Sequence, residues 1–246
     1  MTAKPQHWLV TAGPTVEDID AVRFISNRAT GRLGVELARA ALRAGHRVTL
    51  VHGPISAAVE NRIPRSRRLK VVPVRSAAQM HAAVMRHAPE AGVVVMNAAV
   101  ADYTPRAASR FKLKKSARGL LLHLAPTVDI LKRLGALKRR RAGLRLIGFA
   151  LETGWGRTAR ARRKTQLSEA RRKLAAKNLD AIILDTPQAA GAARGDFTVL
   201  TRDGTIKEYC NVTKVRLARL VVTAFSVPRQ TDTRCSNNPA SPASCG

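Results

Sequence analysis

Several short stretches of this 246-residue sequence group side chains that could bind a phosphorylated ligand. The stretch ISNRATGRLG places Ser26, Asn27 and Arg28 just before the glycine-rich start of a helical pattern. Unpaired backbone N–H groups and the positive end of the helix dipole suit a phosphate at such a position. Close packing of a helix on a strand would also explain Gly31 and Gly34, but it would leave the polar residues unexplained.

A second stretch, NAAVADYTP, places Asp102 and Tyr103 after a run of small residues. Small residues would let a ligand approach the backbone, and an acid there could hold a ribose, a base amine or a metal-bound phosphate. A helix N-cap at Asp102 and a surface tyrosine explain the same pattern equally well.

Lysines recur in two further stretches. In RFKLKKS, Lys112 and Lys114 would share a face if the chain is extended, so the segment could close over a polyphosphate as a lysine-rich lid. A solvated run of charge is the alternative. In KLAAKNLD, Lys173 and Lys177 stand four residues apart and would lie on one face of a helix.

The elements that must position these residues alternate between apolar β-type runs and helical patterns. Strands buried on both faces and joined by helices imply a parallel sheet with right-handed connections. We therefore expect an α/β protein with a Rossmann-like three-layer α/β/α sandwich and a mostly parallel sheet. The expected strands are His7–Ala12, Arg47–His52, Leu69–Val74, Val93–Ala98, Arg145–Ala150 and Ala181–Asp185. The expected helices are Thr30–Ala44, Ala77–His87, Val128–Arg140 and Thr158–Asn178.

Other segments depart from the alternation. The stretch FTVLTRDGTIKEYC predicts a small β-hairpin around Asp203-Gly204, and Gly119–Pro126 predicts a further strand. A helix from Asn211 to about Phe225 is expected to close a single domain spanning residues 1–226. The Pro-, Ser- and Asn-rich residues 227–246 have little to bury, which predicts a disordered C-terminal tail.

The composition bears on whether the protein binds polyanions, spans a membrane, is secreted or contains disulfides or zinc. The sequence has 44 Lys and Arg against 16 Asp and Glu, a net charge of +28. A polyanionic partner would explain this charge, as would a general bias toward Arg on solvated helix faces. No run of 18 apolar residues indicates a membrane span, and no secretory signal is recognisable, so we expect a cytoplasmic protein. Three widely spaced cysteines suggest neither a disulfide framework nor a zinc site.

The motifs resemble those of one family. From about Trp8 to Ala224 the chain resembles phosphopantothenoylcysteine synthetase in the order and spacing of TAGPT, IDAVRFISNRATGRLG, NAAVADY, FKLKK, TVDIL, IGFALET and KLAAKNLDAI. The resemblance implies a ligase of coenzyme A biosynthesis that joins 4′-phosphopantothenate to L-cysteine. The reaction passes through an acyl-nucleotidylate, with release of CMP and pyrophosphate when the nucleotide is CTP. Bacterial members use CTP and Mg²⁺, whereas eukaryotic members generally use ATP.

The resemblance also implies roles for individual residues. Asn27 would handle the acyl intermediate, with its amide donating to the oxygen on which charge develops, and Lys112 would assist catalysis. Substrate binding is expected from Arg23, Ser26, Asn27, Arg28 and Gly31. Nucleotide binding is expected from Met96, Asn97, Ala98, Asp102, Lys112, Val128, Asp129, Ile130, Leu131, Phe149, Lys173 and Lys177. The Mg²⁺ ion is expected to be held mainly by the nucleotide phosphates.

The family also implies an assembly. Its members form homodimers in which one subunit helps to complete the other's site. The flavin-dependent decarboxylase domain that often precedes the synthetase is not recognised in the sequence, so a stand-alone synthetase is expected, with a separate decarboxylase acting on its product. Departures from the family pattern stand at Ala21 and Val128, where prolines are usual, and at Asp185, where an amide is usual.

Two other classes of function stay open at this point. An NAD(P)-dependent oxidoreductase requires a compact glycine fingerprint and an acid about 20 residues later, and the sequence has neither. A non-catalytic nucleic-acid-binding protein would use the +28 charge and would bind in a strongly salt-dependent way.

Overall fold

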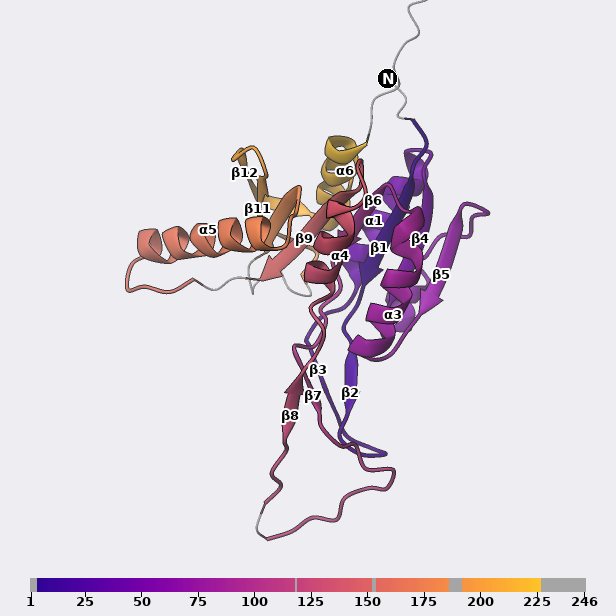
Figure 1. The fold of residues 1–246 in the computed structure, drawn as a ribbon, viewed down its shortest axis with the longest axis vertical. Coiled ribbons are helices and arrows are strands. Elements are labelled where there is room, and N and C mark those ends of the chain that lie inside the picture. Colours follow the sequence, from indigo (N-terminus) through magenta and orange to yellow (C-terminus); the bar gives the residue numbers. More distant parts are fainter. Residues whose placement is uncertain (1–3, 118, 152–153, 186–191, 227–246) are drawn as a thin grey trace, which may run out of the picture.

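The computed structural model describes residues 4–117, 119–151, 154–185 and 192–226. A single twisted sheet of eight strands forms its centre (Figure 1). In spatial order the strands are β12 (Ile206–Thr213), β11 (Arg194–Thr201), β10 (Ala181–Asp185), β9 (Arg145–Leu151), β6 (Val93–Met96), β1 (His7–Ala12), β4 (Arg47–His52) and β5 (Leu69–Pro73). Strands β10 to β5 in this order run parallel, and β11 and β12 are antiparallel. The expected hairpin therefore extends the main sheet at its edge.

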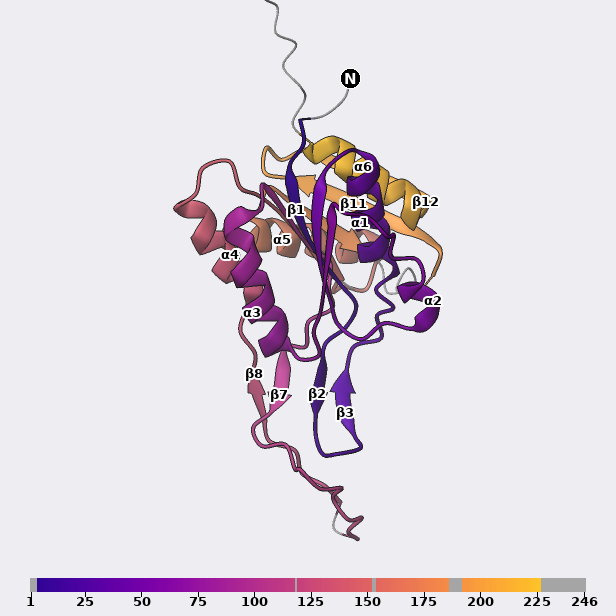
Figure 2. The ribbon, with the colours of Figure 1, turned by 90° about the vertical axis from the view of Figure 1, so that its right-hand side faces the viewer.

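Helices cover both faces of the sheet, as Figure 2 shows with the sheet seen nearly edge-on. One face carries α1 (Arg32–Arg43) and α6 (Lys214–Phe225), together with the short α2 (Ala57–Glu60). The opposite face carries α3 (Ala77–His87), α4 (Ile130–Arg139) and α5 (Ala159–Ala176), with a 3₁₀ turn at Ala88–Glu90. This arrangement confirms the expected Rossmann-like three-layer sandwich.

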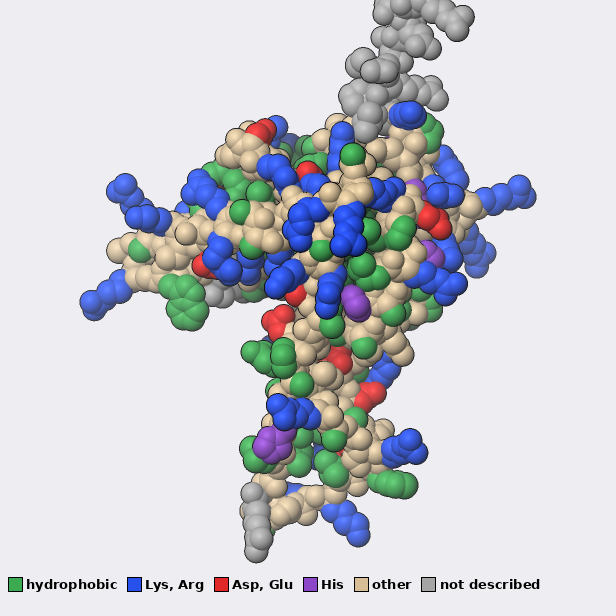
Figure 3. All heavy atoms as spheres, viewed as in Figure 1, with side chains coloured by type: hydrophobic (Ala, Val, Ile, Leu, Met, Phe, Trp, Pro, Cys, Tyr) green, Lys and Arg blue, Asp and Glu red, His purple; other side chains and the backbone are tan. Residues whose placement is uncertain are grey.

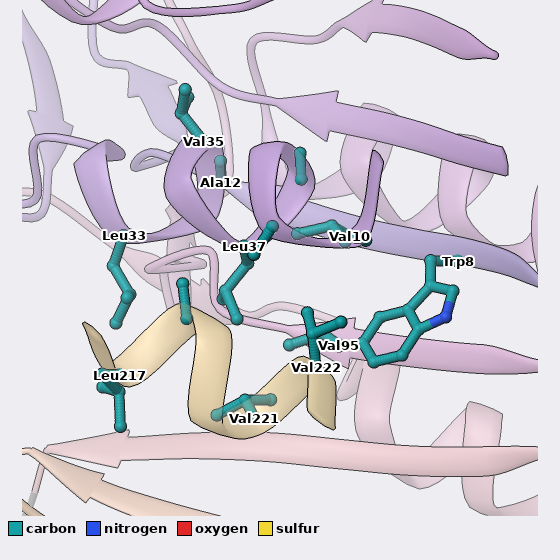
Figure 4. Close-up of a cluster of buried hydrophobic side chains, with 14 of the residues drawn as sticks. Trp8, Val10, Ala12, Leu33, Val35, Leu37, Val95, Leu217, Val221 and Val222 are labelled. Carbon is teal, nitrogen blue, oxygen red and sulfur yellow. The ribbon is translucent and has the colours of Figure 1, made fainter. Parts of the chain in front are cut away.

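The core between β1, α1 and α6 fixes the position of the first helix (Figure 4). All six side chains of β1 are buried; Trp8 points toward Val222 of α6, and Val10 lies beside Leu37 of α1. A Cβ atom added at Gly34 would lie 2.4 Å from the Cβ of Ala12. Gly34 therefore lets α1 pack directly on β1, as the sequence suggested.

Helix α3 has the predicted bounds, whereas other helices begin or end a few residues from the expected positions. Side-chain caps set the starts of α4 and α5. Asp129 precedes α4 and its carboxylate accepts a hydrogen bond from the backbone N–H of Lys132. Thr158 caps α5 in the same way. The predicted start of the last helix at Asn211 is wrong: Thr213 caps α6, and Asn211, with φ of 49°, still belongs to β12.

A long projection extends from one end of the sheet (Figure 1). It consists of residues 16–26 and the described residues of 103–126, and we call it the arm. Its paired strands are β2 (Val16–Asp18) with β3 (Phe24–Ser26), and β7 (Tyr103–Pro105) with β8 (Leu124–Pro126). The polar loop after β1 is therefore largely a hairpin, and the strand expected at Gly119–Pro126 is shorter than predicted.

Two further predictions concern the C-terminal tail and membrane-spanning helices. The predicted disordered tail at 227–246 lies outside the described residues. Within the described part of the chain, no helix combines the length and apolarity needed to cross a bilayer.

Candidate active site

A pocket of about 790 Å³ opens at the carboxyl ends of the parallel strands. Neighbouring strands β1 and β6 are followed by helices on opposite faces of the sheet, and open α/β sheets bind ligands outside such a switch point. Thirteen of the residues predicted from the sequence line this pocket. They are Asn27, Arg28, Gly31, Met96, Asn97, Ala98, Asp102, Val128, Asp129, Ile130, Leu131, Phe149 and Lys177.

The loop after β6 forms the floor of the pocket and is tied to β1. The buried hydroxyl of Thr11 accepts hydrogen bonds from the backbone N–H groups of Asn97 and Ala98, each at 3.0 Å. The hydroxyl of Thr15 accepts a further bond from the N–H of Ala101 at 2.9 Å. These bonds end β6 at Met96, two residues before the predicted end, and fix the backbone that a ligand would contact.

Asn27 lies at the exposed rim of the pocket. Its side-chain amide nitrogen donates to the carbonyl oxygen of Ala99 at 3.0 Å, which joins the end of the β2–β3 hairpin to the floor. The adjacent Ser26 donates its hydroxyl to the carbonyl of Thr15 at 2.8 Å. The hairpin therefore holds Asn27 beside the pocket through two side-chain contacts with fixed backbone.

The N-terminus of α1 faces the same pocket. Gly31 precedes the helix with φ of 77°, a conformation that favours glycine, and no side chain caps the helix at this residue. The N–H of Arg32 reaches the hydroxyl of Thr30 only at 3.4 Å. Among the described contacts, the first turn of α1 thus keeps N–H groups available for an anion.

On the opposite wall, Lys177 and Asp129 form an ion pair at 2.9 Å between the end of α5 and the start of α4. Burial of the Asp129 carboxyl raises its pKa, but the ion pair with Lys177 and the hydrogen bond from Lys132 N–H outweigh this effect. The pKa of Asp129 therefore lies below its ordinary value, and the carboxylate stays ionised. Half-buried Phe149, on β9, lies along the same wall.

Four predicted residues do not line the pocket: Arg23, Ser26, Lys112 and Lys173. Arg23 donates its Nε–H to the carboxylate of Asp20 at 2.9 Å and an Nη2–H to the carbonyl of Leu113 at 2.8 Å. The side-chain hydrogen bond from Arg23 to Asp20, together with backbone N–H donors, holds the pKa of Asp20 well below its usual range. Arg23 therefore links the two halves of the arm. Lys112 is exposed on that arm and does not line the pocket.

The structure adds polar residues to the pocket that the sequence did not indicate as ligands: Thr30, Arg32, Thr127, Asp185 and Lys214. Asp185 stood out in the sequence only as a departure from a family motif. The local sequence around Lys214 signals only a helix start, because Thr213 is a typical N-cap residue. Lys214 lies at the pocket because α6 packs against α1.

The side chains of the pocket suit a Mg²⁺ ion that has few protein ligands rather than one enclosed by several of them. The described residues contain no cluster of three or more His, Cys, Asp or Glu side chains placed to share a metal. Asp102 contributes an exposed carboxylate to the pocket, and no ion pair ties it to another described residue. One carboxylate together with substrate phosphates and waters is a common way to bind Mg²⁺.

Comparisons with known proteins identify the family of the chain. The family model described as the DNA/pantothenate metabolism flavoprotein C-terminal domain matches residues 3–227. The coenzyme A biosynthesis bifunctional protein CoaBC of Bacillus subtilis (strain 168) is 40% identical over 208 residues, covering 82% of this chain and 47% of that protein. The chain thus spans about half the length of that curated relative.

Two solved structures share the fold. The C-terminal domain of coenzyme A biosynthesis bifunctional protein CoaBC has a TM-score of 0.71 at 32% identity, covering 91% of this chain and 95% of that one. The Cab2 mutant H337A in complex with phosphopantothenate-cysteine has a TM-score of 0.70 at 16% identity, covering 89% and 85%, a likeness of fold. The chain belongs to the family of the DNA/pantothenate metabolism flavoprotein C-terminal domain, and this confirms its resemblance to phosphopantothenoylcysteine synthetase.

Proposed function

We propose that this chain is a ligase that joins 4′-phosphopantothenate to L-cysteine with CTP as the activating nucleotide. One observation carries the proposal: in a chain of this family, thirteen of the predicted ligand residues line a single pocket at the carboxyl edge of the sheet. A solved structure with the same fold, the Cab2 mutant H337A, is a complex with phosphopantothenate-cysteine, which is the expected product.

The reaction has two steps. In the first, a carboxylate oxygen of 4′-phosphopantothenate attacks the α-phosphorus of CTP; a P–O bond forms and the bond to pyrophosphate breaks. In the second, the amine of L-cysteine attacks the acyl carbon of the acyl-cytidylate, loses a proton and displaces CMP. The first step brings a carboxylate against a triphosphate, so the site must offset their mutual repulsion.

The residues of the pocket fit these steps. Lys177 supplies positive charge on the wall where the nucleotide would lie, and Phe149 offers an apolar face for its base. The fixed backbone after β6 would orient the nucleotide, because Thr11 holds that loop in place. In the second step Asn27, at the rim, would donate to the oxygen on which charge develops.

Mg²⁺ would be held by the nucleotide phosphates with Asp102 as the protein ligand, and would neutralise charge on the triphosphate. This assignment leaves Asp129 to its ion pair with Lys177. The chain's own residues then bind and orient the two substrates.

The arm supports a homodimer. Its apolar side chains are exposed: Phe24 by 53%, Phe111 by 81% and Leu121 by 80%. Figure 3 shows such side chains on the arm, whereas Lys and Arg cover much of the body. A second copy of the chain would bury the apolar surface and bring Lys112 of the arm to the partner's pocket. A separate decarboxylase would act on the product.

The proposal is tested by incubating the purified chain with Mg²⁺, 4′-phosphopantothenate, L-cysteine and either CTP or ATP, and identifying the product by mass spectrometry. Formation of the amide adduct with CTP supports the full proposal. Formation with ATP alone would correct the nucleotide. Absence of the adduct with both nucleotides would refute the ligase.

A further inference from the structure

Lys214 is a buried cation at the wall of the pocket. It is the first residue of α6 and is only 5% exposed, yet it lines the cavity. Its ammonium group makes no hydrogen bond or ion pair with the described part of the chain. Holding a charge on a mostly buried side chain without direct partners costs free energy, and an anion bound in the pocket would offset that cost.

The charges around Lys214 come from two neighbouring elements. Burial of the ammonium lowers the pKa of Lys214; the carboxylate of Asp185, on β10, opposes this shift, and the guanidinium of Arg32, on α1, adds to it. Asp185 thus offsets part of the positive charge. Arg32 and Lys214 repel each other, and an anion placed between them would relieve that repulsion.

The surrounding groups form a site for an anion. The Nε atom of Arg32 is buried and has no hydrogen-bond partner among the described residues. The uncapped first turn of α1 opens on the same pocket, and α6 packs directly against α1. A lysine ammonium, an arginine guanidinium and helix N–H groups are the donors that commonly bind phosphoryl oxygens.

We propose that Lys214, with Arg32 and the N-terminus of α1, binds a phosphoryl group of the substrates. The identity of the compound rests on the proposed function: the phosphoryl group belongs either to the nucleotide triphosphate or to 4′-phosphopantothenate. The binding of the anion itself does not depend on turnover. A purely structural lysine that only balances Asp185 is the competing explanation.

Calorimetric titration with inorganic pyrophosphate tests the site without catalysis. Lys214→Met keeps an unbranched side chain that is one atom shorter and removes its charge, and we expect it to weaken pyrophosphate binding at least about tenfold. Lys164→Met, on the exposed face of α5, removes the same charge and should bind pyrophosphate as the wild type does. Unchanged binding by a folded Lys214→Met would overturn the proposal.

Asp185→Asn is a second variant that tests the same proposal if Lys214→Met does not fold. Asp185→Asn removes the carboxylate that competes with the ligand for Lys214, so it should tighten pyrophosphate binding about threefold or more. Binding that is unchanged or weaker in a folded Asp185→Asn would overturn the proposal, because a site that uses Lys214 must respond to this carboxylate.

Separate titrations with CTP and with 4′-phosphopantothenate assign the phosphoryl group. Loss of CTP affinity in Lys214→Met would place the triphosphate at Lys214, and loss of 4′-phosphopantothenate affinity would place its phosphate there. Loss of neither would contradict the inference. If pyrophosphate binding depends on Lys214 but the wild-type chain makes no adduct, the anion site stands and the proposed ligase activity fails.

Discussion

The side-chain amide of Asn27 donates a hydrogen bond to the carbonyl oxygen of Ala99 at 3.0 Å. This bond joins the hairpin that follows β1 to the loop that follows β6, so it spans the switch point of the sheet. The predicted catalytic amide is thus held by the same loop that would hold the nucleotide.

Asn27→Asp should separate the two steps of the reaction. The carboxylate cannot donate to the Ala99 carbonyl, and it would repel the oxygen that the amide stabilises. We expect CTP affinity within about threefold of wild type and amide formation reduced at least about a hundredfold. Calorimetry measures the first quantity and quantification of the cysteine adduct measures the second. Asn61→Asp, an exposed residue outside the pocket, introduces the same charge and serves as the control. Wild-type adduct formation by Asn27→Asp would remove Asn27 from the mechanism.

Thr11→Val should loosen the floor of the pocket. The substitution preserves shape but removes the oxygen that accepts two backbone N–H groups, and Thr11 is fully buried. We expect the free energy of unfolding to fall by about 1–3 kcal/mol. Urea denaturation measures this change, with Thr223→Val on the exposed face of α6 as the control. Equal stability of Thr11→Val and wild type would show that this loop does not depend on the hydroxyl.

Lys177→Met should change the acid stability of the protein. The folded state holds the pKa of Asp129 below its ordinary value, so unfolding takes up a proton as the pH falls through about 4. The pair therefore stabilises the fold above that pH, and its contribution is lost as the pH drops to the folded pKa. The pair is partly exposed, which limits its contribution to about 1 kcal/mol or less.

Melting temperatures of wild type and Lys177→Met, measured from about pH 6 down to about pH 3, test this linkage. We expect the difference between the two proteins to shrink as the pH falls. A difference that stays constant across this range would mean that Lys177 acts through packing rather than through the Asp129 carboxylate.

Mixed dimers should test whether Lys112 acts on the partner's pocket. One subunit carries Asn27→Asp and the other carries Lys112→Gln, each inactive as a homodimer. If the arm completes the partner's site, every mixed dimer contains one intact site, and random assembly restores about 25% of wild-type activity. If Lys112 serves its own pocket, no mixed dimer contains an intact site, and co-expression restores nothing.

The sheet and its two layers of helices could be predicted from the sequence because each parallel strand is a continuous apolar run. Strand β1, with all six residues buried, is the clearest example. The strands of the arm were not all predictable, since β2 and β3 pair over only three residues each and neither is fully buried. Helix ends shifted because caps such as Thr213 decide them.

The pocket was predictable where the motif residues follow strands. Met96, Asn97 and Ala98 directly follow or end β6 and reach the pocket together. Contacts between distant segments could not be predicted: Arg23 donates to the carbonyl of Leu113, and Lys214 reaches the pocket only because α6 packs on α1. Such contacts join residues whose local sequences carry no signal of one another.

The central claim is tested most directly by measuring pyrophosphate release with Mg²⁺ and CTP, in the presence and absence of 4′-phosphopantothenate and L-cysteine. The account predicts release that requires 4′-phosphopantothenate, together with the cysteine adduct and CMP once cysteine is added. Release that does not depend on 4′-phosphopantothenate, or no release with either CTP or ATP, would contradict it.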